Sequence, residues 1–197
     1  MVEHVSITDP EIHEPKGAST ATVDQVYIAD GAGSGTWTTW PFGWGFYKDN
    51  ASAQTFNTTA AKLSIDGAGS STEESYLPRE IRGSDSLWDT TNDDITPIAL
   101  GDAYALRLDL PITAKTGSPG ELLLELDISS GSTPTTVIVE RRVTIDPTPP
   151  YNVSIAFPIF VGSTFIANGG QIFLTTDTGT VDITAPGIFL SRISGSI

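Results

Sequence analysis

The chain has 197 residues, of which 24 are acidic and 10 basic, so its formal net charge at pH 7 is −14. This charge argues against non-specific binding to nucleic acid and against docking on an anionic membrane, because both depend on cationic side chains. Cysteine is absent, which excludes disulfides, thiolate nucleophiles and cysteine metal sites, whereas a hydrophobic content of 39% is enough for a packed core.

The first residues of the chain, its apolar runs and its histidines argue against further classes of protein and of site. The first residues are charged and lack an apolar core, so we expect no signal peptide, and no apolar run is long enough to span a membrane. The two histidines are His4 and His13. A Ser-His-Asp triad or a histidine zinc site in the main body is therefore not expected, and we predict no catalytic, cofactor-binding or metal site.

Residues 1–48 are predicted to form an arm, because their hydrophobic residues are sparse and keep no sustained period. Within the arm, residues 25–29 have the pattern of a short strand. The glycine-rich residues 31–35 resemble a phosphate loop only superficially, since no Lys-Ser or Lys-Thr follows and the next segment is β-prone and reaches Pro41. A connecting turn or flexible link is the simpler interpretation.

An aromatic cluster ends the arm. Three of the four tryptophans, Trp37, Trp40 and Trp44, lie within eight residues, followed by Phe46 and Tyr47. So many aromatic side chains in a segment too short for a core of its own indicate that the segment packs on something else. That partner could be the main domain or another chain.

Residues 49–197 alternate apolar and polar side chains with period two, which predicts half-buried antiparallel strands. Turn-forming stretches rich in Gly, Pro, Ser and Asn separate them, and no segment carries a helical stripe. The sequence therefore predicts an all-β sandwich or barrel. The apolar positions expected to face inward are Tyr104, Leu106, Leu108, Leu110, Leu122, Leu124, Leu126, Ile128, Val137, Val139, Val143, Ile145, Val153, Ile155, Phe157, Ile159, Val161, Val181 and Ile183.

Two segments, residues 156–161 and 187–190, are apolar on both faces of a strand. Such a strand is buried on both sides, so we expect a second chain to cover the outer face. The alternative is that loops of the same chain cover it. The candidate residues for an interface between chains are Phe157, Ile159, Phe160 and Phe189.

Both ends of the chain resemble virion proteins of tailed bacteriophages. Residues 13–17, His-Glu-Pro-Lys-Gly, with residues 25–37, which end in Gly-Ala-Gly-Ser-Gly-Thr-Trp, look like an N-terminal module of head-decoration (cement) and head-fibre proteins. Residues 157–177 and 187–190 are similar to phage domains with a trimeric jelly roll of the tumour-necrosis-factor (TNF) type. The resemblance implies an antiparallel jelly-roll sandwich, residues 49–197, that forms trimers behind an extended capsid-anchoring arm, residues 1–48.

The function that the resemblance implies is structural. A homotrimer would decorate and stabilise the outer capsid surface of the virion, with the major capsid protein as its partner and without enzymatic activity, cofactor, nucleic acid or membrane. The candidate capsid-binding residues are His13, Glu14, Pro15, Lys16, Gly17, Trp37 and Trp40.

Two other functions remain open. The same trimer at the tip of a fibre could recognise a host-surface glycan, since sugars stack on aromatic rings and bond to carboxylates; the candidates are Tyr76, Trp88, Asp89 and Asn92. A glycoside hydrolase would need paired carboxylates, for which Glu73/Glu74, Asp93/Asp94 and Glu121/Glu125 are available. Loop calcium is a weaker option, on Asp85, Asp89, Asp93 and Asp94. Solvated surface acids explain all of these carboxylates more simply.

Overall fold

The structure is a computed structural model that describes residues 21–23, 25–29, 32, 35–50, 53–146 and 148–195. The elements of this part of the chain are almost all strands. In chain order they are β1 (Gln25–Ala29), β2 (Gly35–Thr39), β3 (Gly43–Lys48), β4 (Gln54–Phe56), β5 (Ala61–Lys62), β6 (Trp88–Asp89), β7 (Asp94–Ile95), β8 (Ala103–Thr116), β9 (Glu121–Asp127), β10 (Val137–Thr144), β11 (Tyr151–Phe160), α1 (Ser163–Asn168), β12 (Gly170–Thr176), β13 (Thr180–Ile183) and β14 (Gly187–Ser194).

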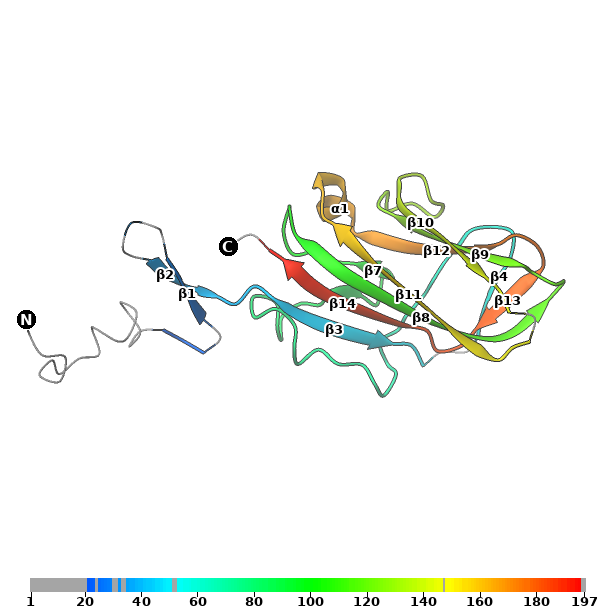
Figure 1. Ribbon diagram of the computed structural model, residues 1–197, viewed down its shortest axis with the longest axis horizontal. Coiled ribbons are helices and arrows are strands. Elements are labelled where there is room, and N and C mark those ends of the chain that lie inside the picture. Colours follow the sequence, from blue (N-terminus) through cyan, green and yellow to red (C-terminus); the bar gives the residue numbers. More distant parts are fainter. Residues whose placement is uncertain are drawn as a thin grey trace, which may run out of the picture.

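Two antiparallel sheets face each other in the body (Figure 1). In the first sheet β14 lies between β3 and β8, and β11 runs along the other edge of β8. Ile112 of β8 pairs with Tyr151 of β11 on one side and with Ile183 of β13 on the other. The long strand β8 is therefore the axis of this sheet, with the order β3-β14-β8-β11 and with β13 and β4 continuing beside its far end.

The second sheet has the order β10-β9-β12-β7-β6, and β5 also pairs with β12. Along the chain, β8 lies in the first sheet, the β9–β10 hairpin in the second, β11 in the first, β12 in the second and β14 in the first. This alternation of antiparallel strands between two facing sheets defines a jelly roll. The all-β jelly-roll sandwich expected from the sequence is confirmed.

The core lies between the sheets and follows the period-two pattern of the sequence. Along β8, Tyr104, Leu106, Leu108 and Leu110 are all at most 1% exposed, whereas the alternate positions are partly or fully exposed. Burial of one such leucine stabilises the fold by roughly 1.5–3 kcal/mol. Buried residues from the facing and neighbouring strands complete the core: Leu122, Leu124, Leu126, Ile155, Phe157, Ile159, Ile172, Leu174, Val181, Ile183, Ile188 and Leu190.

Strand β10 is the main exception to the predicted burial, while Val153 of β11 is also only partly buried. Val137 is 38% exposed, and Val139 and Val143 are only partly buried; of the four positions expected to face inward, only Ile145, just after the strand, joins the core. The reason is topological, since β10 pairs with β9 and is the edge strand of its sheet. An edge strand reaches less of the facing sheet, which the pattern of one strand does not reveal.

One short helix, α1, was not anticipated. Its six residues connect β11 to β12, and only Phe165 among them is buried. The helix ends at Gly169, whose φ of 74° lies in the left-handed region and whose N–H donates to the Phe165 carbonyl (2.9 Å). A helix this short has no room for a repeating apolar stripe, so no sequence period could indicate it. No helix of the described residues is long and apolar enough to cross a membrane.

The body begins earlier than expected. Strand β3 pairs with β14 over six residues, from Gly43 opposite Arg192 to Lys48 opposite Gly187. The predicted boundary after residue 48 is therefore too late, because β3 is an integral strand of the first sheet. Before it, β1 and β2 form a separate antiparallel hairpin, with Tyr27 opposite Trp37, which lies beyond one end of the body in Figure 1. The described part of the arm is thus a β-hairpin, which includes the short strand expected at residues 25–29.

The long connection between β5 and β8 covers one edge of the first sheet. The Trp44 N–H donates to the Tyr76 carbonyl (2.8 Å) and the Phe46 N–H to the Glu73 carbonyl (2.9 Å). Gly69 in turn donates its N–H to the Lys48 carbonyl (2.8 Å). The backbone of residues 69–76 therefore satisfies the groups of β3 that an edge strand would otherwise expose.

Candidate interaction surfaces

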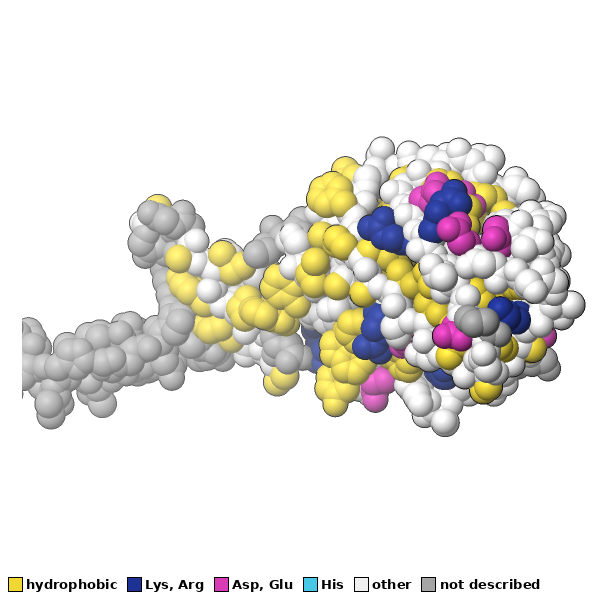
Figure 2. Space-filling view, turned by 45° about the vertical axis from the view of Figure 1, so that its right-hand side comes forward, with side chains coloured by type: hydrophobic (Ala, Val, Ile, Leu, Met, Phe, Trp, Pro, Cys, Tyr) yellow, Lys and Arg dark blue, Asp and Glu magenta, His cyan; other side chains and the backbone are white. Residues whose placement is uncertain are grey.

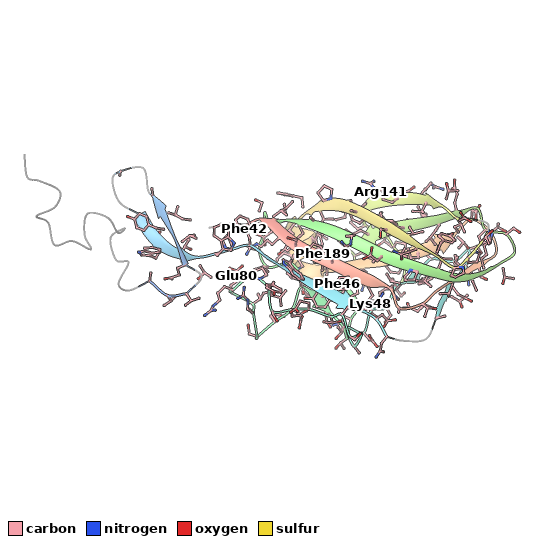
Figure 3. The ribbon with its side chains drawn as sticks, turned by 60° about the horizontal axis from the view of Figure 1, so that its bottom comes forward. Phe42, Phe46, Lys48, Glu80, Arg141 and Phe189 are labelled. Carbon is pink, nitrogen blue, oxygen red and sulfur yellow. The ribbon has the colours of Figure 1, made fainter. Side chains whose placement is uncertain are left out.

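The outward surface of β3, β14, β8 and β11, called here the outer face, is unusually apolar. Phe160 is 68% and Ile193 52% exposed, and Trp44, Phe46 and Phe189 are partly exposed. The pairing register places Phe189 of β14 directly beside Phe46 of β3, as Figure 3 shows. Small side chains of β8 and β11 extend the surface: Ala103, Ala105, Ala156 and Pro158.

The aromatic part of this face is held in place by stacking and by a close backbone approach. Trp44 lies between Tyr76, stacked at a ring-centroid distance of 4.8 Å, and Phe189, at 5.4 Å. A Cβ on Gly187 would lie 2.9 Å from the Phe46 ring, so the ring covers the backbone of β14. The face is therefore ordered before any partner arrives, which lowers the entropic cost of covering it.

Charges on the outer face nearly cancel. The Arg107 guanidinium lies over the Phe189 ring, 5.5 Å from its centroid, and its Nε contacts Asp109 Oδ2 at 3.2 Å. Ser154 of β11 donates its hydroxyl to the other Asp109 oxygen. With Lys48, these are the charged side chains at the outward positions of the described strands β3 and β14 and of the parts of β8 and β11 that face them. In a chain with a net charge of −14, this is a surface where acidic copies would meet with little repulsion.

The four candidate interface residues divide between two environments. Phe160 and Phe189 lie on the outer face. Phe157 and Ile159 point into the core, where they are 4% and 3% exposed, so their selection as interface residues is corrected. The cause is the period of β11, since alternate residues face opposite ways.

The sequence interpretation missed Trp44, Phe46, Pro158 and Ile193 on the outer face. A signal existed for the first two, because Trp40, Phe42, Trp44 and Phe46 are aromatic at every second position and so share one face of an extended chain. The boundary predicted after residue 48 assigned this alternation to the arm, so it was not interpreted as a strand of the body.

The hairpin and the residue that follows it carry the two tryptophans assigned to capsid binding. Trp37 packs edge-to-face on Tyr27 (5.4 Å between centroids), and Trp40, 47% exposed, packs in the same way on Phe42 (5.1 Å). Figure 2 shows hydrophobic side chains gathered on the hairpin and on the adjoining end of the body. The other candidates, residues 13–17, lie outside the described residues.

The candidate glycan residues are separated by the fold. Trp88 is 1% exposed and donates its indole N–H to the Ile65 carbonyl (2.9 Å); it is a core residue, which corrects its selection as a sugar platform. Tyr76 is 54% exposed and stacks on Trp44. Asp89 and Asn92 bond to each other (2.7 Å) within one turn.

A groove does lie in the same long connection between β5 and β8. It has two depressions of about 280 and 540 Å³ that share Glu74 and Ser86. Ser86 donates its hydroxyl to Glu74 Oε1 (2.8 Å), and the same Ser86 oxygen lies 3.0 Å from the Tyr47 hydroxyl oxygen. Six further residues with hydroxyl or carboxylate side chains line the groove: Asp66, Thr72, Ser75, Ser84, Asp85 and Thr90. The remaining lining residues are Tyr47, Gly67, Leu77, Arg82, Gly83 and Trp88.

Three of the remaining carboxylate candidates, Glu73, Glu121 and Asp93, are engaged in local contacts. Glu73 accepts the Ser75 N–H (2.8 Å), and Glu121 pairs with Arg142 at 3.4 Å. Asp93 accepts the hydroxyl of Ser64 (2.9 Å) and the Ile65 N–H (3.0 Å). Among the described residues, no three His, Asp or Glu side chains are grouped so as to hold a metal ion.

Comparison with known proteins gives likeness of shape only. No protein-family model matches the chain, and no curated protein matches it. Among solved structures, the PRD1 vertex protein P5 aligns with a TM-score of 0.48 at 11% identity, over 88% of this chain and 84% of that one. The Eiger TNF of S. frugiperda aligns with a TM-score of 0.42 at 10% identity, over 80% of this chain and 96% of that one. At such scores, the assignment of the fold rests on the strand order of this chain itself.

Proposed function

We propose that this chain is a structural protein of a tailed-phage virion, which decorates and stabilises the outer capsid surface as a homotrimer. The outer face is the observation that supports self-association: it is apolar, ordered and nearly neutral in a strongly acidic chain. The trimeric state and the capsid as partner follow from the resemblance of residues 13–17, 25–37, 157–177 and 187–190 to phage virion proteins. On this proposal the protein has no catalytic role.

Self-association is tested by size exclusion with light scattering. We expect a mass three times that of the 20.8 kDa chain, and we expect the double variant Phe160→Ser/Phe189→Ser to be monomeric, since each buried phenylalanine contributes about 1.5–3 kcal/mol. Ile138→Ser is the matched control, because Ile138 is 42% exposed on β10, in the other sheet. A monomeric wild type, or a double variant that stays trimeric, would contradict the proposal.

Capsid binding is assigned to the N-terminal module, with residues 13–17, Trp37 and Trp40 as contacts with the major capsid protein. Deletion of residues 1–40 should leave the trimer intact and abolish its co-sedimentation with expanded phage capsids. Trp40→Ser in the full chain is the finer variant and should weaken binding without changing the mass of the trimer. Undiminished capsid binding by the deletion variant would remove this assignment.

A second candidate function is recognition of a host-surface glycan, favoured by the groove around Glu74. The Glu74 carboxylate accepts the Ser86 hydroxyl and lies among hydroxyl and carboxylate side chains. Such a carboxylate can accept hydrogen bonds from sugar hydroxyls. The test is a glycan array, with Glu74→Gln as the variant and Glu121→Gln, a surface carboxylate on β9, as the control. Binding lost only in Glu74→Gln would support this function, and an array without signal would dismiss it.

A further inference from the structure

A cluster of buried charges lies where the N-terminal hairpin joins the body. The Arg192 side chain, on β14, is 1% exposed, and its Nη2 contacts Asp102 Oδ1 at 2.8 Å; the Asp102 side chain is fully buried. Nη1 donates to the carbonyl of Pro41 (3.1 Å) and pairs with the carboxylate of Glu80. Arg192 therefore joins β14, the residue before β8, the long connection and the chain leading to the hairpin.

Asp102 is itself fixed in position. Its Oδ2 accepts the Ala99 N–H (3.0 Å) and the hydroxyl of Tyr104 (3.1 Å). Burial raises the pKa of Tyr104, and the neighbouring Asp102 adds to this, so the hydroxyl stays protonated and able to donate. A buried carboxylate with these partners holds the guanidinium in a single place, and the fork of the guanidinium sets the direction of the Pro41 carbonyl.

A second, independent contact constrains the same stretch. A Cβ on Gly43 would lie 2.4 Å from the Pro78 nitrogen and 2.5 Å from the Tyr76 carbonyl oxygen. The backbone of the long connection thus presses directly on the chain two residues after Pro41. On the other side, a Cβ on Gly195 would lie 2.6 Å from the Arg192 guanidinium, so the backbone at Gly195 covers this cluster.

We infer that Arg192, with Asp102 and Glu80, is a positioning group that fixes the direction in which the N-terminal hairpin leaves the body. Only Trp40 separates Thr39, the last residue of β2, from Pro41, so little chain is free to bend between the hairpin and the held carbonyl. This role of Arg192 holds for the isolated protein and does not depend on a capsid. On the proposed function, it would give the N-terminal hairpin a defined orientation for binding to the capsid.

The test measures the hairpin-to-body distance by pulsed electron paramagnetic resonance. Because the chain has no cysteine, spin labels go on Thr36→Cys in β2 and Thr133→Cys in the β9–β10 loop, both exposed. Co-expression with an excess of cysteine-free chain ensures that most of the labelled assemblies carry a single labelled copy. We expect a narrow distance distribution for the otherwise unchanged chain, and one at least twice as wide for Arg192→Lys, which keeps the charge but loses the fork.

Two further variants separate a loss of positioning from a folding defect and from a general effect of removing a charge. Glu80→Gln alters a carboxylate whose side chain is 37% exposed, so it should fold and still widen the distribution; if Arg192→Lys does not fold, this variant decides. Arg142→Gln, whose side chain is 60% exposed on β10, is the matched control and should change nothing. A broad distribution in the unchanged chain, or folded variants with an unchanged distribution, would overturn the inference. Failure to bind capsids alongside the expected distances would refute the proposed function alone.

Discussion

Asp127 shows what one carboxylate does for a loop. Its side chain is fully buried at the end of β9. Its Oδ1 accepts the N–H groups of Thr135 (2.8 Å) and Thr136 (2.5 Å), and Oδ2 accepts the Ser129 N–H (3.0 Å) and hydroxyl (2.5 Å). Burial alone would raise the pKa of Asp127, but these hydrogen bonds outweigh it and lower the pKa below its usual value. The charged form therefore stabilises the closed loop.

We predict that Asp127→Ala lowers the free energy of unfolding by roughly 2–4 kcal/mol at pH 7, since several buried donors lose their acceptor. Because the folded pKa is below that of the unfolded chain, the contribution is complete above about pH 4 and is lost as the pH falls below it. Urea unfolding at pH 7 and pH 3 measures both effects. Equal losses for the variant at the two pH values would contradict this account.

The pKa of Asp94 is shifted in the opposite direction to that of Asp127. Burial raises its pKa to about 6, and the negative charge of Asp89 adds to the effect, whereas Lys62 opposes it. A raised carboxyl pKa means that ionisation destabilises the fold, so stability should fall as the pH rises from about 4 to 6. Asp94→Asn should therefore raise the unfolding free energy by about 1 kcal/mol at pH 7 and have no effect at pH 4. Asp146→Asn, in an exposed turn, is the control for a general charge effect.

At the residue scale, the sequence predicted the burial of a side chain correctly where the period of its own strand determines it. The prediction failed where contacts with distant residues determine burial. The alternation along β8 identified its buried residues, because a strand with one covered face leaves that trace. Trp88 is a failure of this kind, because its neighbours Asp89 and Asn92 are typical of an exposed polar loop. Its indole is nevertheless buried through contacts with residues far along the chain, such as Ile65, and no local pattern carries that information.

At the scale of elements, α1 offers a matched pair of glycines. Gly169 ends the helix with a φ of 74°, and a Cβ there would lie 3.0 Å from the Ile95 carbonyl oxygen. Gly162 begins it with a φ of −90° and open space around its Cβ position.

Gly169→Ala is expected to lower the unfolding free energy by about 1–2 kcal/mol, because alanine must adopt the left-handed conformation. Gly162→Ala should lower it by less than half as much, since its backbone is one that alanine adopts freely. Thermal unfolding of both variants provides the comparison. A larger loss at Gly162 would show that the cap geometry is not what stabilises this corner.

The sequence largely predicted which segments form strands, but it did not predict which strands pair with one another. The alternation predicted β8, β9 and β11 and their inward faces. Which strand lies at an edge depends on the pairing of distant segments, and so the exposure of Val137 on β10 and the inclusion of Gly43–Lys48 in the sheet came only with the structure. The outer face was anticipated from Phe160 and Phe189 because both strand faces were apolar there.

At the scale of the molecule, net charge and the outer face would have opposite effects on the proposed self-association. Copies with a net charge of −14 repel one another, whereas the outer face is nearly neutral. Raising the sodium chloride concentration from about 20 to about 300 mM shortens the screening length from roughly 20 to roughly 6 Å. We therefore predict that the self-association constant increases with salt, as measured by sedimentation equilibrium. An interface held by ion pairs would instead weaken.

The covered edge of β3 has a consequence for the form that assemblies can take. Residues 69–76 occupy the backbone groups along that edge, and the opposite sheet ends in β10, whose exposed segment includes Glu140, Arg141 and Arg142. Neither of these two borders is suited to strand-by-strand growth, the route by which β proteins form filaments without limit. The other border of the first sheet is β11, which pairs with β8 among the described strands. Association through a face, when the rotation between copies closes, ends after a fixed number of subunits. The loop that covers the edge of β3 thus removes one route to a fibre.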